Sequence, residues 1–215
     1  MSITDILGKR LEKIILARLV CTLEYQDFDD CQFAYLKKRS STQAVLALVE
    51  MITKNTLNGK ATGVVFFDFS DAFGSVNRVK LLHKLKLDFG ISGRLWSYIV
   101  SLLSGRMARI QVNQLVGEWL ESLYRTSAGT VLGPILLLAH VHDTPASIVF
   151  KFADNLVSTG IAYDILDVQK SLQEAMDQLA EWAHQWDMLL NISKTKIMLF
   201  GAPNQSGCYY TGQTC

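Results

Sequence analysis

Two aspartates, Asp68 and Asp154, each follow a short apolar run, and they are the strongest chemical signal in this chain. Asp68 comes directly after Val64-Val65-Phe66-Phe67, and Asp154 comes after the run 148–152, which contains one lysine. If two strands bring these residues side by side, their carboxylates form a pair that holds divalent metal ions. Two such ions about 3.5–4 Å apart drive in-line phosphoryl transfer in polymerases and nucleases. The pattern therefore predicts metal-assisted phosphoryl transfer.

Each aspartate also has a simpler explanation when it is taken alone. Asp68 could be the N-cap of a helix over residues 70–76, and Asp154 could be an ordinary residue of a hairpin turn. However, a carboxylate at the end of a buried strand is costly unless it is paired or binds a cation. A glycine-containing segment, residues 129–134, lies between the two aspartates. The combination favours a shared site over two unrelated turns.

The hydrophobic pattern predicts an α+β fold in which helices and strands are interleaved. The predicted helices cover about 3–23, 42–52, 79–89, 92–103 and 165–186, and the predicted strands cover 62–69, 108–113, 147–154, 156–161 and 196–200. The run 62–69 is apolar at nearly every position, as a central strand is.

Length and composition restrict the class of protein. The 215 residues suffice for one large domain or two interleaved subdomains, and the net charge of +1 limits nucleic-acid contacts to local patches. The four cysteines form no CxxC pair, and no signal peptide is evident, so we expect a reduced, intracellular protein, nuclear or cytoplasmic, without a membrane partner. Hydrophobic residues make up 49% and charged residues 19%. Either these apolar residues are buried in a large core, or some of them form surfaces that a partner normally covers.

Short segments in order along nearly the whole chain carry a family resemblance. They are Gln32-Phe33-Ala34-Tyr35-Leu36 with Arg39-Ser40-Ser41-Thr42, then residues 68–76 (DFSDAFGSV), 129–134 (GTVLGP), 152–155 (FADN) and 190–196 (LNISKTK). With these motifs the chain resembles the reverse transcriptase domain of non-LTR (LINE-type) retrotransposons, which is related to group II intron reverse transcriptases.

The resemblance implies the fingers and palm of a right-hand polymerase, with an antiparallel palm sheet packed with helices and with the thumb missing. We therefore expect a palm sheet of four strands or fewer, with helices on one face. Residues 1–60 would be a fingers segment, 61–206 the palm with a fingers return within about 92–128, and 207–215 a truncated start of the primer-grip region. The implied partners are an RNA template with a DNA primer and deoxynucleoside triphosphates. The resemblance does not define an oligomeric state.

The resemblance also assigns the catalytic positions. Asp68 and Asp154 would bind Mg²⁺ or Mn²⁺, and Asn155 occupies a catalytic position where the family has a second aspartate. Lys194 or Lys196 would donate a proton to the leaving pyrophosphate. The alternative for either lysine is a plain surface position.

Contacts to the nucleotide or template would come from a further set of residues. Phe69 and Phe73 would line the nucleotide site, and the bulk of Phe73 would exclude a 2′-hydroxyl group. Gly129 would let the base pair approach the backbone, and the basic cluster Lys37-Lys38-Arg39 would lie near the template or triphosphate. The alternatives are core packing for Phe73, a turn for Gly129 and a solvated loop for the basic cluster.

Departures from the family pattern fall at demanding positions. Asn155 removes a carboxylate, Leu36 replaces an arginine, and residues 126–129 lack the Pro-Gln of the family. Gly74 stands where the family has aspartate, and Asp71 where it has lysine. We therefore expect lost or weak polymerase activity. The open alternatives are a non-catalytic palm-fold remnant that binds nucleic acid weakly, and a purely structural or interaction fragment.

Overall fold

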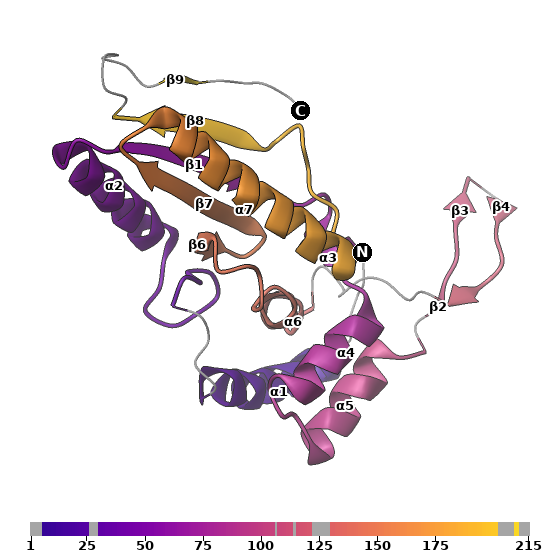
Figure 1. Cartoon of the computed structure of the whole chain (residues 1–215). Coiled ribbons are helices and arrows are strands. Elements are labelled where there is room, and N and C mark those ends of the chain that lie inside the picture. Colours follow the sequence, from indigo (N-terminus) through magenta and orange to yellow (C-terminus); the bar gives the residue numbers. More distant parts are fainter. Residues whose placement is uncertain are drawn as a thin grey trace. The chain divides into compact units, whose positions relative to one another are not determined.

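The computed structural model describes residues 6–25, 30–105, 107–113, 115–121, 130–201 and 209–210. It divides the chain into two units, each formed by two segments (Figure 1). Unit 1 comprises Met1–Phe28 and Asp71–His140, and unit 2 comprises Asp29–Ser70 and Val141–Cys215. Among the described helices, none combines the length and the apolar character that crossing a membrane requires.

Unit 1 is mainly helical and packs around α6, a helix that the sequence analysis did not predict. Its helices are α1 (Ile6–Tyr25), α3 (Ala72–Ser75), α4 (Arg78–Leu87), α5 (Gly93–Leu103) and α6 (Gly133–His140). Helix α6 contacts α1, α3 and α4, and nearly all of its residues are buried. The buried ammonium group of Lys84 donates a hydrogen bond to the carbonyl of His140, the last residue of α6. A cation at this end of a helix is stabilised by the helix dipole.

Unit 1 also carries four short strands where the sequence predicted one. Strand β2 (Met107–Ala108) pairs with β5 (Leu120–Glu121), and β3 (Gln111–Val112) pairs with β4 (Leu115–Val116), both antiparallel. The prediction of one strand over 108–113 was therefore wrong in extent. Outside the strands, the Gly117 N–H donates a hydrogen bond to the carbonyl of Ile110, which lies in the sequence between β2 and β3.

Unit 2 contains a five-stranded antiparallel sheet in the order β6-β7-β1-β8-β9. The strands are β1 (Ala61–Phe67), β6 (Ile148–Phe152), β7 (Asn155–Ala162), β8 (Lys196–Phe200) and β9 (Tyr209–Tyr210). The α+β class, the antiparallel sheet and the central position of β1 are confirmed. The limit of four strands was wrong, because β9 adds a two-residue edge strand.

Two helices of unit 2 cover opposite faces of this sheet: α2 (Ser41–Leu57) and α7 (Ile165–Gln185) (Figure 1). Gly63 of β1 lies directly opposite Gly160 of β7, and a Cβ atom added to either would collide with α7. The residue before Gly160 in β7, Thr159, points to the other face, where its hydroxyl lies 3.8 Å from the sulfur of Met51 in α2. The prediction that helices would pack on one face of the sheet was therefore wrong. Strand β1 is apolar on both faces, so a helix has to cover each face.

Candidate active site

Asp68 lies immediately after the central strand β1 and is held there by backbone hydrogen bonds. The Asn191 N–H donates to the Asp68 carbonyl at 2.8 Å, and the Ser70 N–H donates to the Leu189 carbonyl at 2.7 Å. The Asp68 side chain is 18% exposed. It does not cap a helix, since the N-cap of α3 is Asp71. Asp68 therefore presents its carboxylate at the end of the most buried strand in the sheet.

Asp154 lies in the two-residue turn that joins β6 to β7. The preceding residue, Ala153, has a φ of 57°, in the left-handed region. Strand β7 pairs with β1 so that Leu156 faces Phe67. This register places the turn at the same end of the sheet as Asp68.

The charges of three side chains interact at this end of the sheet. Burial is the main cause that raises the pKa of Asp154, the charge of Asp68 raises it further, and a backbone N–H bond and Lys194 oppose the rise. The Nζ atom of Lys194 lies 2.8 Å from Oδ2 of Asp68. This hydrogen bond, together with the Asp68 charge, raises the pKa of Lys194. The structure thus brings together Asp68, Asp154 and Lys194.

Asn191 positions Lys194, a role that the sequence analysis missed although Asn191 was part of a recognised motif. Its side-chain oxygen accepts hydrogen bonds from the Ser193 hydroxyl at 2.7 Å and from the Lys194 N–H at 3.3 Å. Such an asparagine-led turn is a local sequence signal. The other candidate, Lys196, donates instead to the Ser193 carbonyl. Of the two lysines proposed as proton donors, only Lys194 contacts Asp68.

Asn155 begins β7 and is exposed beside the carboxylate pair. Its Nδ2 atom lies 3.5 Å from Oδ1 of Asp154, the outer limit of a hydrogen bond. Asn155 also lines an apolar groove of about 240 Å³ between the sheet and α2, together with Phe66, Phe152 and Val157. A neutral amide therefore occupies a position from which a carboxylate would add charge next to Asp154.

The aromatic and glycine candidates come from different parts of the chain. The Phe69 ring is 2% exposed and packs on Trp182 of α7, with ring centroids 6.1 Å apart. Its side chain packs in the core, and its contact with a nucleotide stays a prediction. Phe73 lies in α3 of unit 1 and is half-buried, so its nucleotide contact stays a prediction. Gly129 lies outside the described residues, as do residues 126–128.

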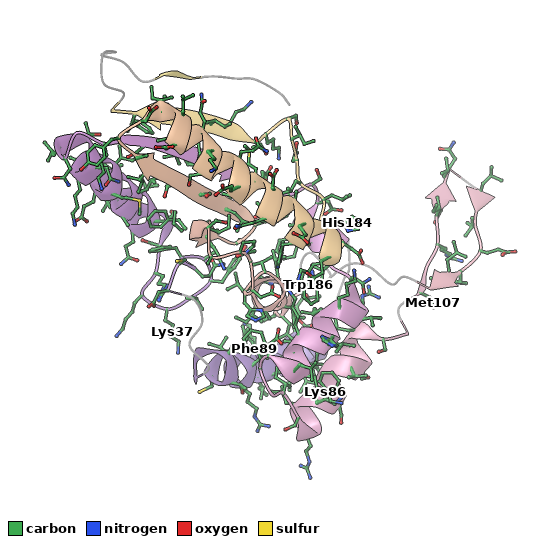
Figure 2. All side chains as sticks on the ribbon, viewed as in Figure 1. Lys37, Lys86, Phe89, Met107, His184 and Trp186 are labelled. Atoms are coloured by element: carbon green, nitrogen blue, oxygen red, sulfur yellow. The ribbon has the colours of Figure 1, made fainter. Side chains whose placement is uncertain are left out.

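The basic cluster splits into two kinds of residue. Lys37 is exposed and projects from the loop that leads into α2 (Figure 2). Arg39 instead folds back on its own loop, where it pairs with the Asp30 carboxylate at 2.9 Å and donates to the Gln32 carbonyl at 2.8 Å. Its guanidinium lies over the Phe33 ring. Lys37 and Arg39 both remain candidates for nucleotide contacts, and Arg39 also fixes the loop.

The donor set suits a divalent cation but is short of one charge. Asp68 and Asp154 supply hard oxygen ligands of the kind that Mg²⁺ prefers, and a cation would offset the burial and the Asp68 charge that raise the pKa of Asp154. In the part of the chain that the structure describes, no group of three or more His, Cys, Asp or Glu side chains could hold a metal. Two carboxylates and the neutral Asn155 are the available ligands.

The sequence decides the family. Residues 1–215 match the family described as reverse transcriptase (RNA-dependent DNA polymerase). The chain belongs to the reverse transcriptase family. This reverse transcriptase chain is 23% identical to a probable RNA-directed DNA polymerase from transposon X-element and 24% identical to the RNA-directed DNA polymerase from mobile element jockey, both of Drosophila melanogaster.

These relatives define the type of reverse transcriptase. The similarity covers 93% and 96% of this chain, and the chain spans 23% of the length of each relative. The chain is therefore related over nearly its whole length to reverse transcriptases of non-LTR retrotransposons.

Telomerases are among the solved structures with a similar fold. Apo telomerase from Candida tropicalis, truncated from its C-terminal domain, has a TM-score of 0.58 at 10% identity, over 94% of this chain and 42% of that one. Telomerase from Candida tropicalis in complex with a fragment of telomeric RNA has a TM-score of 0.59, also at 10% identity, over 94% and 35%. At this identity the likeness shows the mixed α+β fold with its antiparallel sheet.

Proposed function

We propose that this chain is the fingers and palm part of a non-LTR reverse transcriptase domain, built for two-metal nucleotidyl transfer but with weak or no remaining activity. The observation that carries the proposal is the pair Asp68 and Asp154. Adjacent strands bring them to one end of the sheet, and the Asp68 charge contributes to the raised pKa of Asp154. In this proposal residues 1–60 belong to the fingers, and 61–206 form the palm with a fingers return near 92–128. Residues 207–215 would begin the primer grip.

The proposed partners are an RNA template with a DNA primer and deoxynucleoside triphosphates, inside the cell. Asp68 and Asp154 would hold Mg²⁺ or Mn²⁺, which when bound supplies charge neutralisation for the triphosphate and activates the primer 3′-hydroxyl. Lys194 has its ammonium group at Asp68 Oδ2, where it offsets one negative charge. In this proposal Lys194 would give a proton to the leaving pyrophosphate.

The expected weakness of catalysis follows from the groups that the site lacks. Asn155 supplies no charge, and Leu36 and residues 126–129 depart from the family at positions that hold the triphosphate and base pair. Removing one charge-stabilising or positioning group costs about 10²–10³ in rate. Several such losses together leave little activity above background.

Primer extension on an RNA template with Mg²⁺ or Mn²⁺ tests this proposal. We expect no extension by the chain as it stands. We expect measurable extension after Asn155→Asp combined with restoration of Pro-Gln before Gly129, and its loss when Asp68→Ala is added. Robust synthesis by the unmodified chain, abolished by Asp68→Ala, would show that the site is active as it stands.

The second candidate is a non-catalytic remnant that binds nucleic acid weakly, and the neutral amide of Asn155 favours it. In that case the repaired form also fails to extend a primer, although both forms bind a primer–template duplex in a salt-dependent manner. An interaction fragment without this chemistry would bind no duplex.

A further inference from the structure

Gln32 is a buried polar residue to which the proposed chemistry assigns no role. Its side chain is 2% exposed. Its single Oε1 atom accepts two backbone hydrogen bonds, from the Ala34 N–H at 2.9 Å and from the Ala153 N–H at 3.2 Å. The second bond joins residues 121 positions apart in sequence and reaches the residue just before Asp154.

The turn that Gln32 contacts has a backbone that needs support. Ala153 has a φ of 57°, a left-handed conformation that a residue with a Cβ atom adopts at an energetic cost. Such a conformation persists only when its surroundings impose it. The side chain of Gln32 is the described group that bonds the Ala153 N–H, and it does so from inside the protein.

The loop that carries Gln32 is itself fixed to the hairpin. The Lys151 N–H donates to the Cys31 carbonyl at 2.7 Å, and the Phe33 N–H donates to the Lys151 carbonyl at 2.8 Å. Arg39 holds the same loop by donating to the Gln32 carbonyl. Gln32 therefore has little freedom to follow the turn if the turn moves, and it acts as a fixed acceptor.

We propose that Gln32 is a positioning residue, which holds the Ala153-Asp154 turn and thereby keeps the Asp154 carboxylate beside Asp68. The inference rests on the proposed function, since the carboxylate pair is its proposed metal site. The role needs a hydrogen-bond acceptor at the end of a side chain three carbons long. Glutamine meets this requirement without adding charge next to two carboxylates.

Three variants of the full chain separate positioning from general stability. Gln32→Met keeps the length and volume but leaves two buried N–H groups without an acceptor. Gln32→Glu keeps an acceptor. Ser158→Ala is the matched control, because it removes a different side-chain bond of the same hairpin, to the Ser147 carbonyl at 2.8 Å.

The first readout is amide hydrogen exchange, which needs no metal. We expect Gln32→Met to accelerate exchange of the Ala153 amide at least tenfold more than that of Val65 in the central strand. Gln32→Glu should retain the protection of Ala153, and Ser158→Ala should leave it unchanged. Unaltered protection in Gln32→Met, or equal acceleration of Ala153 and Val65, would overturn the inference.

The second readout is the affinity for Mn²⁺ alone, measured by titration calorimetry. Loss of a group that orients a metal ligand weakens metal binding by about 10–100-fold, and we expect a loss in this range for Gln32→Met but not for Ser158→Ala. Wild-type affinity in Gln32→Met would also overturn the inference. If the unmodified chain and its Asn155→Asp form bind no Mn²⁺ while Ala153 is selectively deprotected, the proposed function fails and the role of Gln32 in holding the turn stands.

Discussion

The ammonium group of Lys194 lies 2.8 Å from Oδ2 of Asp68, so a side-chain cation already sits at one of the two carboxylates. Lys194 is 67% exposed and is free to swing away, whereas Asp68 is fixed at the end of β1. A metal ion that uses Asp68 must compete with this lysine. If the proposed function holds, this contact would set part of the metal affinity of the site.

Lys194→Met should tighten binding of Mn²⁺ by about fivefold, because one positive charge is removed close to the ion in a solvated setting. Titration calorimetry at constant ionic strength measures this change. Lys196→Met is the control, since Lys196 bonds the Ser193 carbonyl instead of Asp68. Equal affinity in all three forms would mean that Asp68 is not a metal ligand.

Asn155→Asp should also tighten Mg²⁺ and Mn²⁺ binding, through a new charge near Oδ1 of Asp154, where the amide nitrogen now lies at 3.5 Å. Without metal the same change should lower the Tm, because it adds repulsion between carboxylates. Thermal melts with and without Mn²⁺ measure both effects. If the metal affinity does not change, position 155 does not face the ions.

Asp154→Asn should raise the Tm at pH 7 by a few degrees. Burial and the Asp68 charge raise the pKa of Asp154 above its usual value of 3.8, so the folded protein binds this proton more tightly than the unfolded chain. Stability contributed by the protonated form is present below the unfolded pKa and is lost as the pH rises through the folded pKa. The advantage of Asp154→Asn should therefore shrink as the pH falls toward 3.8.

Thermal melts of the unmodified chain and of Asp154→Asn between pH 7 and pH 4 measure how the difference in Tm changes with pH. Asp177→Asn, on the exposed face of α7, is the control for a change of carboxylate to amide away from Asp68. A Tm advantage for Asp154→Asn that is constant with pH would contradict the assignment.

Lys37→Ala with Lys38→Ala should flatten the salt dependence of nucleic-acid binding. Each phosphate contact contributes about −0.7 to −0.9 to the slope of log K against log salt, so losing two contacts should reduce the slope by about 1.4–1.8. Binding to a labelled duplex at several salt concentrations measures it. Lys170→Ala on α7 is the control, and an unchanged slope in the double variant would assign the two lysines to a solvated loop.

Gly160→Ala should destabilise the protein more than Gly63→Ala. A Cβ atom at Gly160 would lie 2.8 Å from the backbone oxygen of Val168, whereas at Gly63 it would meet side-chain atoms of Leu172 and Val168. Side chains can move aside, but a helix backbone cannot do so cheaply. Overpacking of this kind costs about 1–3 kcal/mol, and chemical denaturation of both variants gives the order.

The sheet of unit 2 could be predicted from the sequence because its strands carry clear signals. A continuous apolar run ending at Phe67 indicated a central strand, and the runs on either side of Ala153-Asp154 indicated a hairpin. Helix α6 was missed for the opposite reason. It is apolar on all sides, so it shows no helical period that could be read from the sequence.

The carboxylate pair was predictable, but the direction of Phe69 was not. Because residues 64–67 are all apolar, the sequence does not reveal which face is which. The structure shows that Gly63 faces α7, and alternation along the extended chain puts Phe69 on the same face, against Trp182. The bonds of Gln32 and Asn191 also needed the structure, because they depend on backbone turns formed elsewhere.

The pairing of Phe67 with Leu156 has a consequence for the history of this chain. Shifting a strand by one residue moves all its side chains to the other face, so one inserted or deleted residue within β1 or β7 would separate Asp68 from Asp154. The departure at position 155 is a substitution, which leaves the spacing intact. Asparagine and aspartate codons differ at one nucleotide. A single nucleotide change at position 155 would therefore add a carboxylate next to Asp154 without altering the pairing of β1 with β7.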